Sequence, residues 1–303
     1  MRIIFLILLL PVLVFSQGIT DKHKSVIARK NVAGGEPAAY TTEATRYFAA
    51  MGTQLADSQK TNINDFVVML HDSLAIDSLA EFFDVMYLLA NETEEAGLLN
   101  LVKRSSDGTR SGVNLTFTQW QGFTGNTNLG YIDMNYDARN DGVNYTQNSA
   151  SFGCYQRIVE SGTIHNQMGV YDTTAGGTPL RCFQANPYED GIYSDRVYIN
   201  RGSWGSGLDP DVRGLGTKIA TRISSSEVSA YINGVGGTVT SNPSEGVPTL
   251  SFYVCGYNSL GTSDESTDQI SFAFIGASVT ATQARQISNC IEAYLDGIGA
   301  GVL

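Results

Sequence analysis

Residues 269–297 read Gln-Ile-Ser-Phe-Ala-Phe-Ile-Gly-Ala-Ser-Val-Thr-Ala-Thr-Gln-Ala-Arg-Gln-Ile-Ser-Asn-Cys-Ile-Glu-Ala-Tyr-Leu-Asp-Gly, a strand pattern followed directly by a helix pattern. In the first part Ile270, Phe272 and Phe274 alternate with small residues. Side chains two positions apart on a strand lie on the same face of a sheet. The spacing therefore predicts a strand that buries these three side chains together.

The second part carries the signals of a helix. Thr280 and Gln283 form a capping-box pattern at its start, and Gly297 is placed to end it in the left-handed conformation. A helix of this length is marginal alone, so its apolar stripe must pack on another layer. The stripe consists of Ala284, Ile287, Ile291 and Leu295. We therefore expect a C-terminal helix that packs on a sheet.

The N-terminal forty residues are predicted to lie outside the folded body. Residues 1–16 form an apolar run after Met1-Arg2, typical of a signal peptide cleaved after Ser16, or of a hydrophobic arm used in assembly. Residues 17–40 are an extended lead-in. The chain has a net charge of −11, which does not suit the phosphates of a nucleic acid.

Residues 41–110 are predicted to form a small helical unit, because apolar residues recur in them at helical spacing after polar residues that suit N-caps. The third helix of this unit is predicted to follow Asp77 or Ser78. It would place four apolar side chains on one face, namely Phe82, Val85, Met86 and Leu89.

Residues 111–303 change to a period of two and predict about nine short strands separated by turn signals, before the C-terminal helix. Asn233-Gly234 between two such runs predicts a type I′ hairpin, which needs positive φ at both positions. A mainly β fold follows: an antiparallel β-sandwich or jelly roll with a small N-terminal helical unit and a C-terminal helix.

Motifs of hydrolytic chemistry are missing from the sequence. Glucan-cleaving sandwiches place paired carboxylates on one strand face, and no such spacing occurs. No nucleophile motif stands near a histidine either, so we expect no enzymatic activity. The spacing of the four cysteines does not match a zinc site, and it favours free thiols. Two disulfides remain the alternative. The cysteines are Cys154, Cys182, Cys255 and Cys290.

One acidic turn is a weak calcium candidate. Asp133, Asn135 and Asp137 match the first, third and fifth positions of a calcium loop. Ala138 stands where the loop needs glycine, and Asn144 where it needs a bidentate glutamate. The better interpretation is a turn rich in Asp and Asn, without a metal or another cofactor.

Aromatic side chains are the remaining candidates for binding. Trp204 lies in a glycine-rich stretch that offers little bulk to cover an indole, and Tyr193 and Tyr198 precede it. Trp120 lies among the first strands. Exposed aromatic rings can stack on the apolar faces of sugar rings, so these four are predicted binding residues. The alternative is that they belong to the core.

Several stretches together resemble a group of tailed-bacteriophage virion proteins, namely Tyr87–Lys103, Trp120–Asn126, Gly142–Gly153 and Ile270–Ala277 with the helix that follows. The β part is similar to concanavalin A-like, LamG-type domains. The resemblance implies a non-enzymatic virion protein of the shell, fibre or receptor contact, associated with other virion proteins, with itself as a homo-oligomer, or with a cell-surface glycan. The alternative is a secreted protein that binds or cleaves carbohydrate.

Overall fold

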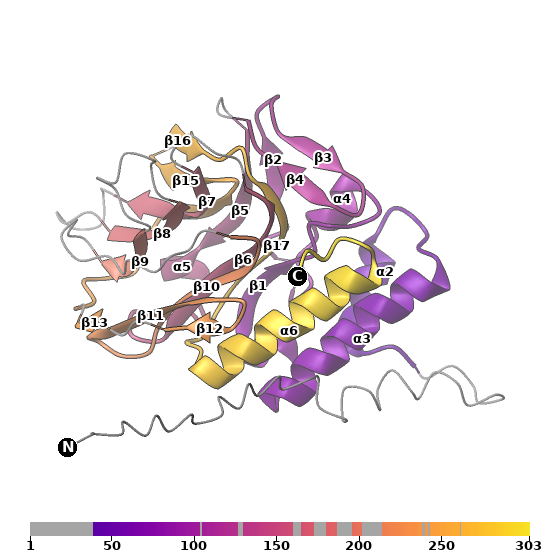
Figure 1. Cartoon of the computed structure of the whole chain (residues 1–303), viewed down its shortest axis with the longest axis horizontal. Helices are drawn as coiled ribbons and strands as arrows, with labels where there is room; N and C mark the ends of the chain where they lie inside the picture. Colours follow the sequence, from indigo (N-terminus) through magenta and orange to yellow (C-terminus); the bar gives the residue numbers. More distant parts are fainter. Residues whose placement is uncertain are drawn as a thin grey trace, which may run out of the picture. The chain divides into compact units, whose positions relative to one another are not determined.

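Two β-sheets and a layer of helices build the described part of the chain (Figure 1). The structure is a computed structural model, and the residues it describes lie in one unit, Tyr40–Leu303, preceded by Ala39. The described residues are 39–103, 105–126, 130–159, 165–172, 180–186, 196–201, 214–237, 240–241, 243–260 and 262–303. The predicted signal peptide or arm at 1–16 lies outside them.

Sheet A has nine strands within the described ranges, in the order β12-β11-β10-β6-β17-β4-β3, with β1 on β17 and β13 on β11. All its pairs are antiparallel. Its strands are β1 (Phe83–Tyr87), β3 (Thr116–Thr118), β4 (Gly122–Thr124), β6 (Ala150–Ile158), β10 (Gly216–Arg222), β11 (Glu227–Ile232), β12 (Val235–Gly236), β13 (Thr240–Ser241) and β17 (Gln269–Gly276).

Sheet B has eight strands in the same ranges, in the order β16-β15-β7-β14-β5-β2, with β8 and β9 continuing from β7. The β7–β15 pair is parallel, and the other pairs are antiparallel. Its strands are β2 (Thr109–Ser111), β5 (Tyr131–Asp137), β7 (His165–Asp172), β8 (Leu180–Asn186), β9 (Arg196–Arg201), β14 (Ser251–Val254), β15 (Gly256–Ser259) and β16 (Thr262–Glu265).

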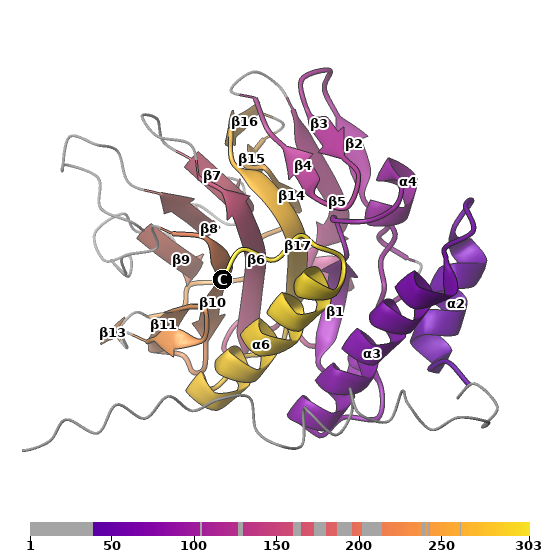
Figure 2. The ribbon, with the colours of Figure 1, turned by 45° about the vertical axis from the view of Figure 1, so that its right-hand side comes forward.

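The helices cover the face of sheet A that points away from sheet B (Figure 2), except the short helix at Ala138–Asp141, which contributes Ala138 to the core between the sheets. Two long ones, α3 (Asp57–Leu74) and α6 (Ala281–Gly297), lie side by side although about two hundred residues separate them in sequence. The others are α2 (Thr42–Ala50), the short α4 (Glu94–Gly97) and α5 (Ala138–Asp141), and the 3-10 turn η2 (Leu79–Glu81). No helix in the described ranges is both long and apolar enough to cross a membrane.

Two hydrophobic cores result from this layering. One lies between the helices and sheet A, where Phe66 of α3 meets Phe272 and Tyr294. The other lies between the two sheets and contains Phe152, Phe252 and their neighbours. Sheet A is therefore buried on both faces, and the prediction of a mainly β fold with two packed sheets and a C-terminal helix is confirmed.

The C-terminal helix begins as the sequence predicts. Thr280 Oγ1 accepts from the backbone N–H of Gln283, and the Gln283 side chain accepts from the N–H of Thr280. The helix also ends at Gly297 as predicted, but the left-handed residue is Gly299, with φ 75°, and not Gly297. The predicted stripe is buried: Ala284, Ile287, Ile291 and Leu295 are at most 1% exposed.

The strand β17 departs from strict alternation. Phe272 and Phe274 face the helices, as predicted, but Ile270 belongs to the core between the sheets. The pairing of β17 with β6 shifts register between Ile270 and Phe272. Such an irregularity reverses the side on which the preceding residues point, so the prediction of one shared face is wrong for Ile270.

The predicted third helix of the N-terminal unit is wrong. Residues 83–87 form β1, which pairs with β17 through Met86↔Phe274 and Tyr87↔Ala273. An apolar run of this length suits a buried strand as well as a helix, and periodicity alone does not separate them. The residues assigned to a helical unit, 41–110, therefore also supply a strand to the sandwich.

Other local predictions hold. Asn233 (φ 51°) and Gly234 (φ 70°) connect β11 and β12 in a two-residue hairpin. The three cysteines whose side chains are described are free and buried, and they are Cys154, Cys255 and Cys290. Cys182 lies in β8, and its side chain is outside the described part.

Candidate functional site

Two of the four predicted binding residues, Trp204 and Tyr193, lie outside the described residues. The other two lie on different sides of the molecule. Tyr198 is on β9 of sheet B, and Trp120 follows β3 of sheet A. The structure therefore does not bring Tyr198 and Trp120 into one site.

Tyr198 belongs to a group of tyrosines on the outer face of sheet B. Its neighbours Val197 and Ile199 point into the core between the sheets, so Tyr198 points the other way and packs with Tyr257. Further along this face Tyr131 stacks on Tyr253, with ring centroids 3.9 Å apart. Tyr198 is fully buried, so the prediction that its ring is exposed for binding is wrong.

Trp120 lies in the tight turn between β3 and β4, not inside a strand as the sequence predicts. Its φ of 57° is in the left-handed region, which costs a non-glycine residue roughly 1–2 kcal/mol. The backbone N–H of Trp120 donates to Asn91 O at 2.8 Å. Asn91 is itself buried and donates to the hydroxyl of Tyr47 at 2.9 Å. The buried side of the turn is therefore fixed in this conformation by hydrogen bonds through Asn91.

The indole of Trp120 lines a hollow of about 220 Å³. The start of α3 contributes Ser58 and Gln59, and the end of α6 contributes Gly297 and Ile298. We call this the Trp120 hollow. Trp120 is half-buried and packs on the core between the helices and sheet A. One wall is thus an aromatic ring, and the others carry a hydroxyl, an amide and backbone groups at helix ends.

A carboxylate bridges two sides of the Trp120 hollow. Glu92 accepts from Gln119 Nε2 at 2.8 Å and from Gln59 Nε2 at 3.3 Å. Gln119 directly precedes Trp120, and the side-chain Oε1 of Gln59 accepts from the N–H of Ala56 at 2.8 Å to cap α3. The carboxylate therefore ties the turn that carries Trp120 to the first turn of α3.

Sequence reasoning found Trp120 but not its partners. Gln59 and Gly297 are separated by more than two hundred positions, and both look like ordinary helix-end residues. Only the packing of α3 beside α6 brings them together. Trp120 itself stands out as an aromatic residue among the first strands, but no signal in the sequence marks the turn in which it lies.

The three weak calcium candidates serve as local hydrogen-bonding groups. Asp133 accepts from the N–H of Asn135 and from Ser251, and Asp137 caps α5 by accepting from the N–H of Arg139. Asn135 donates to Asp107 O and to Thr109 Oγ1. Within the described ranges, no group of three Asp, Glu, His or Cys side chains is placed to hold a metal ion.

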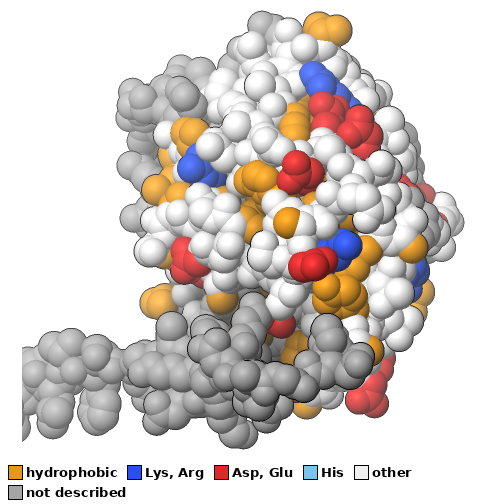
Figure 3. Space-filling view, turned by 90° about the vertical axis from the view of Figure 1, so that its right-hand side faces the viewer, with side chains coloured by type: hydrophobic (Ala, Val, Ile, Leu, Met, Phe, Trp, Pro, Cys, Tyr) orange, Lys and Arg blue, Asp and Glu red, His pale blue; other side chains and the backbone are white. Residues whose placement is uncertain are grey.

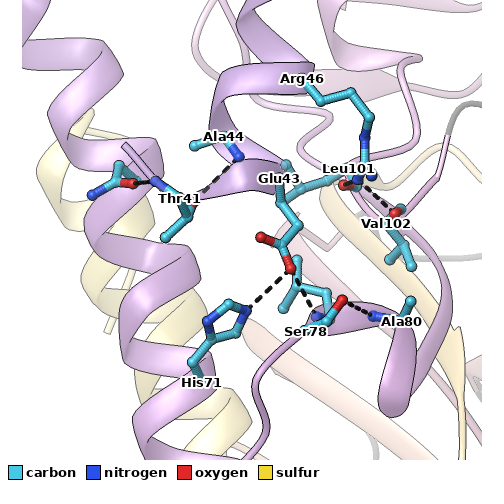
Figure 4. A network of polar contacts seen from close by, with 11 residues as sticks. Thr41, Glu43, Ala44, Arg46, His71, Ser78, Ala80, Leu101 and Val102 are labelled. Carbon is cyan, nitrogen blue, oxygen red and sulfur yellow. Dashed lines mark hydrogen bonds and ion pairs between the residues drawn. The ribbon is translucent and has the colours of Figure 1, made fainter. Parts of the chain in front are cut away.

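A buried acid–base pair joins α2, α3 and η2 (Figure 4). His71 Nε2 lies 3.3 Å from Glu43 Oε1, in range for an ion pair but without hydrogen-bond geometry. Leu79 N–H donates to the same Glu43 oxygen at 3.1 Å. Ser78 Oγ accepts from Ala80 N–H and so caps η2. The described contacts of Glu43, His71 and Ser78 therefore link the three helical elements to one another.

We expect the contribution of Glu43 to stability to depend on pH. Burial raises its pKa, but the N–H donors, including that of Leu79, and the nearby His71 outweigh burial and lower it below 4.5. Because the pKa of Glu43 is lower in the folded state, its carboxylate stabilises the fold at pH values above its pKa in the unfolded state. This contribution is lost as the pH falls through its pKa in the folded state. Glu43→Gln should therefore cost about 1–2 kcal/mol of unfolding free energy at pH 7.

Urea unfolding of both proteins at pH 7 and pH 3 measures this difference. The gap between the parent and Glu43→Gln should shrink at pH 3, where Glu43 is protonated in the unfolded state. A gap of the same size at both values would contradict the assignment of the effect to the Glu43 carboxylate.

Comparisons with known proteins give a likeness of fold to several solved structures. No protein-family model and no curated protein matches the chain. Solved structures do match. Trypanosoma rangeli sialidase in complex with sialic acid has 12% identity and a TM-score of 0.49, and the match covers 93% of this chain and 40% of the sialidase chain. The chain thus spans less than half of that sialidase.

Two carbohydrate-binding structures also match. Domain 4 of AbnA, a GH43 extracellular arabinanase from Geobacillus stearothermophilus in complex with arabinotriose, has 13% identity, a TM-score of 0.40, and coverage of 68% of this chain and 98% of its own. The CBM40 of Ruminococcus gnavus IT-sialidase bound to α2,3 sialyllactose has 13% identity, a TM-score of 0.39, and coverage of 61% and 98%.

The prediction that the protein is not an enzyme is corrected by the sialidase match, because a sialidase is a glycan-cleaving enzyme. The prediction rested on missing paired carboxylates, and that test was too narrow, since some glycosidases use a tyrosine nucleophile instead. All three TM-scores lie below 0.5, so no activity and no residue role is transferred from these structures.

Proposed function

We propose that this protein binds carbohydrate, and that the Trp120 hollow holds a sugar ring against the indole. The observation that carries the proposal is the backbone of Trp120, a large aromatic residue kept at a φ that favours glycine, beside a hollow with polar walls. Backbone strain of this kind is retained where a side chain must be presented in one direction.

The chemistry of the walls supports a sugar over a purely apolar ligand. A pyranose has apolar C–H faces, which suit the indole, and hydroxyl groups around its rim, which need both donors and acceptors. Ser58 offers a hydroxyl, and the Gln59 amide has one N–H beyond its bonds to Glu92 and Ala56. The hollow thus combines one stacking surface with several hydrogen-bonding groups.

The finer fold assignment is part of the proposal. Two packed, mainly antiparallel sheets support a concanavalin A-like jelly roll of the LamG type. A virion location, a homo-oligomer and partners in a phage particle stay predictions from the sequence. The absence of a cofactor, with Ca²⁺ as a weak candidate, also stays a prediction from the sequence. The sequence suggests two settings, a virion protein and a secreted or surface-exposed carbohydrate-binding protein. The second agrees better with the Trp120 hollow.

Removing the Trp120 indole should abolish most of the binding. We expect Trp120→Gly to weaken the best ligand on a microarray of neutral and acidic glycans about 30-fold, corresponding to about 2 kcal/mol. Glycine is favoured at a φ of 57°, so relief of backbone strain offsets lost packing, and the melting temperature should stay close to that of the parent.

Two further variants act as controls. Trp120→Phe keeps an aromatic ring and should lose less affinity than Trp120→Gly. Tyr131→Ala removes a partly exposed ring from sheet B and should bind as the parent does. Unchanged glycan binding by a folded Trp120→Gly protein, or no binding by the parent to any glycan on the array, would reject the proposed function.

A further inference from the structure

The charges around the Trp120 hollow restrict the class of sugar that it accepts, an inference that rests on the proposed function. None of the described residues that line the hollow is Lys or Arg. Sugar acids are bound through their carboxylate, and Arg or Lys supplies the charge-assisted hydrogen bonds for it. The described walls of the hollow therefore lack the group that a sialic or uronic acid requires.

The charged side chain that contacts the walls is acidic. Glu92 receives its hydrogen bonds from two neutral amides, those of Gln59 and Gln119. No basic side chain within the described residues forms an ion pair with Glu92. Its negative charge is therefore held beside the hollow without a counter-charge. A ligand carboxylate in the hollow would meet a like charge, which is unfavourable at short range.

The nearest basic residue in sequence does not compensate. Lys60, one position after Gln59, lies 3.9 Å from Asp57 in the first turn of α3. The end of α6 also has no basic residue in its last turn, and a helix C-terminus carries partial negative charge. On the side that Figure 3 shows, acidic and basic side chains are scattered between separate hydrophobic patches. Among the described side chains of this view, the basic ones do not gather into a cluster.

The size of the hollow limits the length of the ligand. Its volume of about 220 Å³ is smaller than the roughly 300–1,000 Å³ of pockets that enclose drug-sized ligands. One sugar ring against the indole fills such a space, whereas an extended chain would leave most of its units outside.

We infer that the Trp120 hollow takes a single uncharged sugar unit at the end of a glycan and rejects sugars that carry a carboxylate. Glu92 sets this specificity by two means. It positions the Trp120 turn against α3, and it places a negative charge where an acidic sugar would bind.

Three ligands of one shape test the inference with the full chain. Methyl glucoside is neutral, methyl glucuronide carries a carboxylate, and methyl glucuronamide has the same planar group without charge. The matching galactose series covers the other common hexose. The readout is the NMR signal of the Trp120 indole N–H, assigned with Trp120→Phe. We expect the neutral sugar and the amide to bind, and the carboxylate to bind at least about tenfold more weakly than either.

Two changes should restore acidic binding if charge is the cause. Glu92→Gln should reduce the tenfold difference to about twofold, and 0.5 M NaCl should reduce it in the parent because salt screens the repulsion. The salt series needs no substitution. It therefore still tests whether charge repulsion weakens binding of the acidic sugar if the Glu92→Gln protein does not fold.

The outcomes separate this inference from the proposed function. Equal binding of glucuronide and glucoside would overturn the neutral-sugar inference and leave the Trp120 site in place. Equally weak binding of the amide and the carboxylate would assign the effect to shape and would also overturn it. No shift of the Trp120 signal with any glucose or galactose derivative, in a protein that binds no glycan on the array, would overturn the proposed function itself.

Discussion

Replacing Asp84 by alanine is expected to lower the free energy of unfolding by about 3 kcal/mol or more. Asp84 is 2% exposed on β1, and its carboxylate accepts from the backbone N–H groups of residues 143, 144 and 145. It also accepts from the Tyr136 hydroxyl at 2.8 Å. Each buried donor left without a partner costs about 1–3 kcal/mol, although a water in the vacated space can satisfy some of them.

Chemical denaturation of Asp84→Ala measures this loss, with Asp77→Ala as the control. Asp77 is exposed and makes no described hydrogen bond, so its replacement should change stability by less than about 0.5 kcal/mol. Asp84→Asn retains one acceptor oxygen and should fall between the two. An Asp84→Ala protein as stable as Asp77→Ala would show that the segment 143–145 does not depend on this carboxylate.

Truncating Ile291 to alanine should cost about 2–5 kcal/mol, the range for a large apolar residue in a core that relaxes little. Ile291 is fully buried in the middle of α6, in the core between the helices and sheet A. Rigid aromatic rings surround it in the same core. The ring centroid of Phe66 lies 5.3 Å from that of Tyr294 and 5.7 Å from that of Phe272. Little collapse into the cavity is expected.

Asn289→Ala is the matched control on the same helix. Asn289 is exposed, and alanine has a higher helix propensity, so this change should be neutral or slightly stabilising. Thermal melts of both variants compare directly, because α6 keeps its length and its cap in each. A melting temperature of Ile291→Ala equal to that of Asn289→Ala would show that α6 is not part of the cooperative core.

The two substitutions test different links between distant parts of the chain. Asp84 joins β1 to the segment after α5, and Ile291 joins α6 to α3 and sheet A. The Trp120 hollow depends on the second link, because its walls come from the start of α3 and the end of α6. We therefore expect substitutions that loosen α6 to weaken sugar binding without touching the ligand.

Local sequence signals determined several elements of this protein. The capping box at Thr280 and the Asn233-Gly234 turn depend on residues within four positions of one another, so their geometry follows from local chemistry alone. The alternation of side chains predicted part of the strands of both sheets for the same reason, although not β1. The stripe of α6 also predicted which side of that helix is buried.

Tertiary structure decided the rest. Residues 83–87 are apolar at nearly every position, so their pattern allows a helix or a buried strand, and the free edge of β17 selects the strand. The register shift beside Ile270 likewise arises from pairing with β6. The candidate site needs Trp120, Gln59, Glu92 and Gly297 together, and these residues carry no shared local signal. They meet only because α3 and α6 bury their apolar stripes on the same face of sheet A, a long-range contact that no short window of sequence encodes.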